Sequence, residues 1–113
     1  MIMVSRYSKG DVIVVPFSFA DLSGVKKRPA LVLASLPGDD IVICQITGKL
    51  LSDEFSISLL DGDVIGGSLQ KISWIRPNKM FTTDSSIVSY KVGQISISKI
   101  KDVEIVLVEL FTR

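Results

Sequence analysis

RPALVLAS, residues 28–35, is an almost continuous apolar run that begins with a charged residue, Arg28. A short apolar run bounded by turn residues is typical of a buried strand. The turn residues Pro37-Gly38-Asp39-Asp40 follow it, and the chain then enters a second apolar run, Ile41–Ile46. We therefore predict that the two runs form a central hairpin.

Further strands are predicted on both sides of this hairpin. Asp11–Phe17 is a β-branched run that follows a Lys9-Gly10 turn, and we expect Pro16 to end its regular pairing. The downstream candidates, which alternate in polarity or lie between turn signals, are Phe55–Leu59, Leu69–Ile75, Lys79–Thr82 and Ile87–Val92, the last ended by Gly93. Short strands at such regular spacing favour a small barrel or sandwich over a parallel α/β sheet.

The C-terminal stretch from Ser98 fits a strand or a helix by its pattern alone. An N-cap serine at position 98 and an apolar stripe at helical spacing favour a helix. The predicted stripe consists of Ile100, Val103, Leu107, Leu110 and Phe111. The opposite side still carries Ile105 and Val108, and this surplus of apolar surface predicts a subunit interface.

Length and charge limit the classes of protein that the chain can represent. With 113 residues, we expect residues 1–113 to form a single domain with one core. The net charge of +1 gives no general attraction to nucleic acid, but basic segments at 1–34 and 71–101 flank an acidic segment at 35–70. If the basic segments meet in space they form a positive face; the alternative is scattered, solvated charge.

The chain contains no histidine, which excludes imidazole bases, Ser-His-Asp and Cys-His arrangements, and His-ligated metals. The acidic groups lie among turn residues, so we interpret them as solvated loops and expect no metal or other cofactor. These groups are Asp39-Asp40, Asp53-Glu54 and Asp61-Gly62-Asp63.

The single cysteine, Cys44, lies inside an apolar run and is expected to be a core thiol in a reducing cytoplasm. The first six residues lack the pattern of a signal peptide, and no apolar run approaches the length of a membrane span. We therefore expect a cytoplasmic protein with no membrane partner.

Three segments together resemble the MazF/PemK family of toxins from toxin–antitoxin systems. They are Lys9–Val15, Lys27–Leu33 and the strand end Ile46-Thr47. The order and spacing match across the first half of the chain, and the layout stays similar through Ser73–Pro77 and the turn at Lys91-Val92-Gly93. The Arg-Pro-apolar strand followed by a strand that ends in threonine is the more specific part of this match.

The resemblance implies a fold, an activity and partners. The fold is a small SH3-like barrel of the MazF/CcdB toxin type, mainly β with a C-terminal helix, in a homodimer. The activity is that of a metal-independent endoribonuclease, which cuts single-stranded RNA by 2′-hydroxyl attack and leaves 2′,3′-cyclic phosphate and 5′-hydroxyl ends. The partner is a cognate antitoxin whose disordered tail covers the RNA groove and through which the toxin contacts DNA only indirectly.

The resemblance also implies that Arg28 and Thr47 are the catalytic residues. A guanidinium can stabilise the extra negative charge of a phosphorane, but it stays protonated and is no base. Two departures from the family concern a further acid or base: Ser23 stands where some members have an acid, and Ser68 and Gln70 stand where others have Arg and Asp. The identity of the general base is left open.

From the residues alone, Arg28 and Thr47 can also be an exposed charge and a β-branched residue at strand ends. RNA binding asks for cations along the backbone and flat side chains for bases. The candidates are Lys26 and Lys27 for phosphates, Phe17 and Phe19 for stacking, and Ser18, Gln45 and Ser73 for base edges and the groove wall. Phe17 has a second interpretation as a core residue.

Two other classes of function remain open at this point. A toxin of the same fold can act by binding a protein target, as gyrase-poisoning toxins do, through the end of its C-terminal helix. The chain can also be a small barrel that binds its partners without catalysis. Fold alone does not choose among these classes.

Overall fold

The computed structural model describes residues 6–18, 25–49, 53–69 and 71–113, with the backbone alone for Phe17, Ser18 and Val25. The strands are β1 Asp11–Ser18, β2 Val25–Ser35, β3 Asp40–Thr47, β4 Ile57–Leu59, β5 Val64–Ile65, β6 Ser73–Asp84 and β7 Tyr90–Ile95. The helices are the 3₁₀ turns η1 Asp61–Asp63 and η2 Ser85–Ile87 and the α-helix α1 Ile97–Phe111. Within these ranges, no helix has the length and hydropathy needed to cross a membrane.

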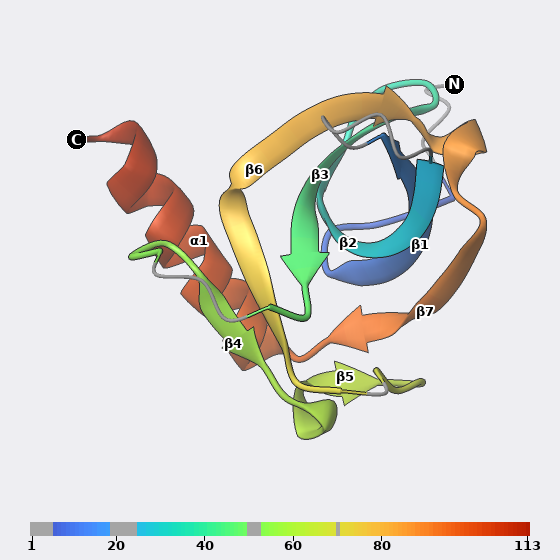
Figure 1. Ribbon diagram of the computed structural model, residues 1–113. Coiled ribbons are helices and arrows are strands. Elements are labelled where there is room, and N and C mark those ends of the chain that lie inside the picture. The colour runs from blue at the N-terminus through green and yellow to red at the C-terminus, as the bar shows by residue number, and fades with distance from the viewer. Residues whose placement is uncertain (1–5, 19–24, 50–52, 70) are drawn as a thin grey trace.

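The strands form one antiparallel sheet in the order β4-β6-β3-β2-β1-β7-β5. The sheet curls into a nearly closed barrel, and α1 lies outside it, as Figure 1 shows. β2 and β3 stand in the middle of the order and pair as neighbours, with Leu31 opposite Cys44. The predicted central hairpin and the predicted fold, mainly β with a C-terminal helix, are therefore confirmed.

The central residues of the hairpin strands, 30–33 and 41–44, are apolar because both faces of the sheet are largely buried there. One cluster packs between the sheet and α1 and includes Leu31, Cys44 and Val103. The other lies on the opposite face and includes Val32 and Ile43. Neighbouring residues of one strand point to opposite faces, so a strand buried on both sides needs a continuous apolar run. Each fully buried aliphatic side chain contributes about 1.5–3 kcal/mol to folding.

The predicted position of Cys44 in the core is confirmed. The side chain is fully buried, and this burial raises the pKa of the Cys44 thiol to about 12, against the smaller lowering effect of a hydrogen bond with the backbone of Leu31. A thiol with so high a pKa stays protonated at neutral pH and behaves as a small apolar group.

The prediction that Pro16 ends the pairing of the first strand is wrong. β1 continues to Ser18 and pairs with β2 beyond the proline, with Pro16 opposite Lys27. Pairing of β1 with β7 covers only Asp11 to Val14. The other edge of β1 is therefore unpaired at Pro16 in the described residues, and a proline without an N–H costs no ladder hydrogen bond there.

The strands predicted as Leu69–Ile75 and Lys79–Thr82 form one strand, β6, which begins only at Ser73. It passes through Pro77 by means of a register shift. Cys44 of β3 is opposite Met80, whereas the next residue, Gln45, is opposite Arg76. The three residues between Arg76 and Met80 therefore form a bulge, and a bulge is a position where a sheet tolerates proline.

The strand predicted as Ile87–Val92 lies further along the chain, at β7 Tyr90–Ile95, because Ile87 belongs to η2. Gly93 does not end this strand but lies within it. A Cβ atom at Gly93 would lie 2.6 Å from the carbonyl oxygen of Ile65. Glycine is needed here for the close approach of two backbones, and it is no turn signal.

The C-terminal helix is confirmed, but two details of its prediction are wrong. Its N-cap is Ser96, whose Oγ accepts a hydrogen bond from the backbone N–H of Lys99 at 3.3 Å. Phe111, placed on the core face by its spacing, is 71% exposed because it lies in the last turn. Ile105 and Val108 are exposed as predicted, at 64% and 63%.

Candidate active site

Arg28 and Thr47 line one cleft of about 330 Å³ at the open end of the β2–β3 hairpin. We call it the cationic cleft. Its lining residues are Arg28, Pro29, Gln45, Ile46, Thr47, Gly48, Lys49, Lys71, Ser73 and Arg76. Among the described residues that line it, four side chains are cationic and none is a carboxylate. This composition is that of a site for an anion.

The register of the hairpin explains why Arg28 and Thr47 meet. Ala30 of β2 is opposite Gln45 of β3. The recorded pairing ends there, and Arg28 and Thr47 lie two residues further along their strands, on the face shared by Ala30 and Gln45 because side chains alternate along a strand. Both side chains line the same cleft. One hairpin therefore brings the guanidinium and the hydroxyl to the same place.

A backbone contact at the strand end fixes the hydroxyl of Thr47. Its Oγ1 accepts a hydrogen bond from the N–H of Lys49 at 3.2 Å. With a lone pair engaged in this way, the hydroxyl proton is directed elsewhere and can be donated to a bound oxygen. Thr47 is therefore prepared to act as a hydrogen-bond donor.

Arg76 belongs to the cationic cleft, although the sequence analysis did not assign it a role there. It stands opposite Gln45 in the β3–β6 pairing, and its Nη1 donates to the Oε1 of Gln45 at 3.3 Å. Its Nε and Nη2 donate to one oxygen, Oδ2, of Asp53 at 3.3 and 3.0 Å. These three bonds hold the guanidinium in a single orientation.

The interpretation of Asp53-Glu54 as a solvated loop is wrong for Asp53. Its side chain is only 11% exposed and pairs with Arg76. The backbone N–H of Phe55 donates to its Oδ1 at 2.9 Å. This hydrogen bond, followed by those from Arg76 and Asn78, lowers the pKa of Asp53 below its ordinary value of 3.8. The turn also delays the fourth strand, predicted from Phe55, until Ile57.

A glycine gives Lys71 its position beside the cleft. A Cβ atom at Gly48 would lie 2.4 Å from Cε and 2.7 Å from Nζ of Lys71. The lysine therefore crosses the end of β3 where the backbone carries no side chain. Its ammonium lies close to the peptide that follows Thr47, which adds a positive charge next to the predicted catalytic pair.

A second, larger depression of about 710 Å³ adjoins the cationic cleft, and we call it the tyrosine groove. Its lining residues are Val14, Lys27, Pro29, Ser68, Leu69, Lys71, Ser73, Tyr90, Lys91 and Val92. Three of them, Pro29, Lys71 and Ser73, also line the cationic cleft. Lys27 reaches this groove because consecutive strand residues such as Lys27 and Arg28 point to opposite faces.

The structure divides the predicted RNA-binding residues among several places. Gln45 and Ser73 line the cationic cleft, and Lys27 lines the tyrosine groove. Ser73 is buried, and its Oγ donates to the carbonyl oxygen of Lys71 at 3.2 Å, so it supports that lysine. Lys26 is exposed and lines neither depression. The side chains of Phe17 and Ser18, and the whole of Ser23, Phe19 and Gln70, lie outside the described residues.

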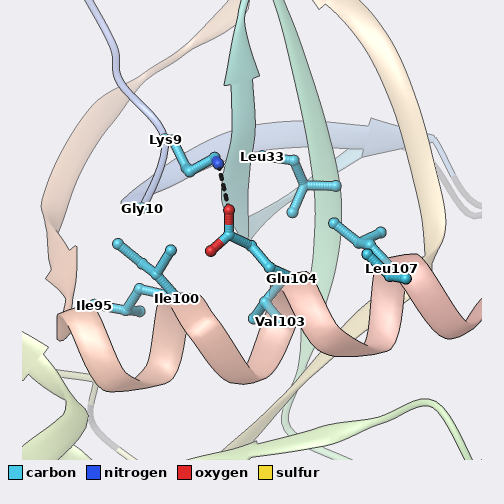
Figure 2. Close-up of a pocket in the computed structure, with 9 residues that line it drawn as sticks. Lys9, Gly10, Leu33, Ile95, Ile100, Val103, Glu104 and Leu107 are labelled. Carbon is cyan, nitrogen blue, oxygen red and sulfur yellow. Dashed lines mark hydrogen bonds and ion pairs between the residues drawn. The ribbon is translucent and has the colours of Figure 1, made fainter.

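A third depression, the helix pocket, lies between α1 and the barrel (Figure 2) and has a volume of about 210 Å³. Its lining residues are Lys9, Gly10, Leu33, Ile95, Ile100, Val103, Glu104, Leu107 and Val108. Among these described lining residues the one cation is Lys9, which forms an ion pair with Glu104 at 2.8 Å, as the dashed line in Figure 2 marks. The remaining side chains are apolar, and none lines the cationic cleft.

Possible metal ligands do not cluster in the part of the chain that the structure describes. No group of three or more Cys, Asp or Glu side chains comes together there. Asp53 forms an ion pair with Arg76, and Asp63 lies 3.5 Å from the ammonium of Lys99. These carboxylates therefore hold cationic side chains of the protein itself.

Comparison with solved structures identifies the same fold in bacterial toxins. A MazE-MazF complex from Deinococcus radiodurans matches with a TM-score of 0.72 at 18% identity, over 94% of this chain and 96% of that one. The Mycobacterium tuberculosis toxin MazF-mt6 matches with a TM-score of 0.70 at 16% identity, over 90% and 96%. An endoribonuclease in complex with its cognate antitoxin, from a mycobacterial species, matches with a TM-score of 0.72 at 11% identity, over 95% and 96%.

At these identities the structural matches show the fold alone, and they confirm the predicted toxin-type barrel. No curated protein matches the sequence. A family model does match it, over residues 8–111, and its description is PemK-like, MazF-like toxin of type II toxin-antitoxin system. This span includes the central hairpin, the cationic cleft and all of α1. The chain therefore belongs to the PemK-like, MazF-like family of toxins of type II toxin-antitoxin systems.

Proposed function

We propose that this toxin is an endoribonuclease that cleaves single-stranded RNA in the cationic cleft without a metal ion. The observation that carries the proposal is the meeting of Arg28 and Thr47 in a cleft whose described lining contains four cations and no carboxylate. A scissile phosphodiester is an anion that gains further negative charge during cleavage. The cations of the cleft therefore stabilise the transition state, which carries the extra charge, more than they stabilise the bound substrate.

Arg28 is assigned the stabilisation of the reacting phosphate. Its planar guanidinium can donate to two non-bridging oxygens, and its strand is held by the core behind it. Loss of one preorganised donor of this kind costs on the order of 3 kcal/mol, or about a hundredfold in rate. Arg76, fixed by Asp53 and Gln45, supplies a second oriented cation to the same cleft.

Thr47 is assigned the orientation of the reacting oxygens. Its hydroxyl accepts from the N–H of Lys49 and can donate to a phosphate oxygen. The hydroxyl of threonine keeps its proton at neutral pH and therefore cannot accept the proton of the 2′-hydroxyl. A guanidinium also stays protonated. The proposal therefore assigns neither Thr47 nor Arg28 as the general base.

The reaction follows from these roles. The ribose 2′-oxygen attacks phosphorus and loses its proton, the bond between phosphorus and the 5′-oxygen breaks, and that oxygen gains a proton. The products are a 2′,3′-cyclic phosphate and a 5′-hydroxyl end. The cations of the cleft lower the energy of the pentavalent state between these two events. The phosphorus–oxygen bonds that form and break belong to the RNA, whereas the 2′-hydroxyl proton passes to a base and the 5′-oxygen takes its proton from an acid, each of them water or a side chain other than Arg28 and Thr47. The contribution assigned to Arg28 and Thr47 is charge and positioning.

Partners follow from charge and from apolar surface. We propose that a cognate antitoxin neutralises the toxin by placing an acidic segment over the cationic cleft, and that the toxin meets DNA only through this partner. One of the matched proteins was solved in complex with its cognate antitoxin and another as a MazE-MazF complex, as their names state. We also propose a homodimer in the cytoplasm, supported by the exposed apolar side chains Ile105, Val108 and Phe111 of α1.

A fluorogenic single-stranded RNA assay in EDTA tests the activity. Wild type should cleave, and Arg28→Ala and Thr47→Ala should each lose nearly all cleavage while they keep the thermal midpoint of wild type. Lys101→Ala, which removes an exposed lysine of α1 outside all three depressions, should cleave as wild type does. Mass spectrometry of the products should find 2′,3′-cyclic phosphate. Failure of the wild type to cleave any RNA would favour a toxin that acts by binding alone.

A further inference from the structure

We propose that the tyrosine groove is a nucleotide-binding subsite, which holds the base and phosphate of the residue next to the scissile linkage. The proposal rests on the function proposed above and extends it to a second site on the same RNA strand. It begins with continuity: Pro29, Lys71 and Ser73 form a wall common to the groove and the cationic cleft. An RNA strand bound in the cleft would therefore place its next nucleotide in the groove.

Tyr90 provides the surface for a base. Among the described residues that line the groove it is the one aromatic residue, and it is 57% exposed although it begins the strand β7. An aromatic ring left open to water at a fixed backbone position can stack on an unpaired base of any sequence. The groove volume of about 710 Å³ falls within the range of about 300–1,000 Å³ that is common for sites of small organic ligands.

Two lysines supply the charge for the phosphate. Lys27 and Lys71 line the groove, and neither forms an ion pair with any described residue. Lys71 lies across Gly48, so a phosphate bound by it would stand at the boundary between groove and cleft. Lys91 is different, because it pairs with the buried Asp11 at 3.2 Å. The available positive charge therefore lies on the side of the groove that faces the cationic cleft.

The aromatic ring and the two lysines give the groove the two elements that single-stranded RNA requires. Phosphate contacts contribute an affinity that falls with salt, and each neutralised phosphate of a single strand adds about 0.7 to the slope of log K against log salt. Stacking contributes an affinity that salt hardly changes. Lys27 and Tyr90 should therefore differ in the salt dependence of their effects.

Binding of a non-cleavable probe tests the subsite independently of catalysis. Fluorescence anisotropy with a labelled single-stranded 2′-O-methyl RNA decamer measures affinity, because the methylated 2′-oxygen cannot attack. Tyr90→Ala should weaken binding about tenfold at all salt concentrations, and Tyr90→Phe should bind within twofold of wild type. Lys27→Ala should weaken binding and reduce the salt slope by about 0.7, whereas Lys101→Ala should change neither. Circular dichroism checks that each variant is folded.

A second measurement locates the contact directly. Ultraviolet cross-linking of the same probe with 5-bromouridine should modify the peptide that contains Tyr90. Decamer affinity unchanged in Tyr90→Ala, or equally weak in Tyr90→Phe and Tyr90→Ala, would overturn the subsite. Wild type that binds the probe through Tyr90 but cleaves no RNA would leave the subsite standing and refute the nuclease. Cleavage of RNA combined with probe binding that does not depend on Tyr90 would support the nuclease and refute the subsite.

Discussion

The cationic cleft and the helix pocket are both concave, but they differ in how their charges are arranged. Among the described residues that line the helix pocket there is one cation, and Glu104 neutralises it across 2.8 Å. The described lining of the cationic cleft contains four cations and no carboxylate, and Asp53 pairs with Arg76 without lining the cleft. Shape alone therefore does not mark the site. The concentration of positive charge in its lining does.

The largest effect is expected from Arg28, because it tests the cationic cleft itself. Arg28→Ala should lower kcat/KM for RNA by about a hundredfold, which is on the order of 3 kcal/mol of transition-state stabilisation. Arg28→Lys keeps the charge but loses the planar fork, so we expect about a tenfold loss. Single-turnover cleavage measures both variants. Activity of Arg28→Lys equal to that of wild type would show that charge alone is required and that the forked geometry has no role.

A smaller effect, on stability as well as activity, is expected from the pair that supports the cleft. Asp53→Asn replaces a carboxylate that accepts two hydrogen bonds from a largely buried guanidinium, so it should destabilise the fold by about 1–2 kcal/mol at pH 7. Urea denaturation of wild type and variant measures this difference. Cleavage should also fall, because Arg76 loses its fixed orientation.

The same pair predicts a pH dependence with a definite sign. The pKa of Asp53 is lower in the folded protein than its ordinary value of 3.8. The folded state therefore binds fewer protons at this carboxyl than the unfolded chain does, so the hydrogen bonds that the carboxylate accepts, first from the N–H of Phe55 and then from Arg76, stabilise the fold above about pH 4. As the pH falls below this value, the stability difference between wild type and Asp53→Asn should narrow. A difference that stays constant from pH 7 to pH 3 would contradict the role given to the pair.

Gly48→Ala tests the position of Lys71. The added methyl group would meet Cε and Nζ of Lys71, the mobile end of a long side chain, so the lysine should move aside at little cost in stability. We expect about a tenfold loss of kcat/KM, the equivalent of about 1.4 kcal/mol, with an unchanged thermal midpoint. Lys71→Ala is the matched control and should lose as much. A loss much larger in Gly48→Ala would point to the backbone of β3 instead.

The smallest effect is expected at the helix pocket. Lys9→Ala removes an ion pair whose two side chains are about half exposed, and such pairs contribute about 0–1 kcal/mol. RNA cleavage should stay at the wild-type level. A clear loss of cleavage would mean that this pocket takes part in the function, and the contrast between the two depressions would no longer hold.

The part of the site that is local in sequence was the part that could be predicted. Arg28 and Thr47 belong to adjacent strands of one hairpin, and the apolar runs behind them indicate those strands directly. The resemblance to a toxin family then gave them roles, and the structure brings both to one cleft. The strands and the C-terminal helix were predictable for the same reason, since strand and helix periodicities are local properties of a sequence, whereas the choice of a barrel over a sandwich came from the resemblance.

The contacts made by distant segments could not be predicted. Asp53 and Arg76 are 23 residues apart and meet only because β6 returns beside β3. Asp53 lies among turn residues, where a carboxylate is ordinarily solvated, so its local sequence predicted a solvated side chain and no ion pair. The bulge that accommodates Pro77 and the seat of Lys71 on Gly48 also depend on strand register. The register between strands that no short turn connects depends on how those strands pair in the sheet, which the local sequence does not specify.

The double burial of the β2–β3 hairpin has a consequence for molecules that inhibit the toxin. The central amides of these strands should exchange their hydrogens only when the entire sheet opens, because both sides of the hairpin are covered. Arg28 and Thr47 are thus carried by the segment that opens last. A ligand that fills the cleft meets strand ends that are already ordered, so little of its affinity is spent on restricting the backbone.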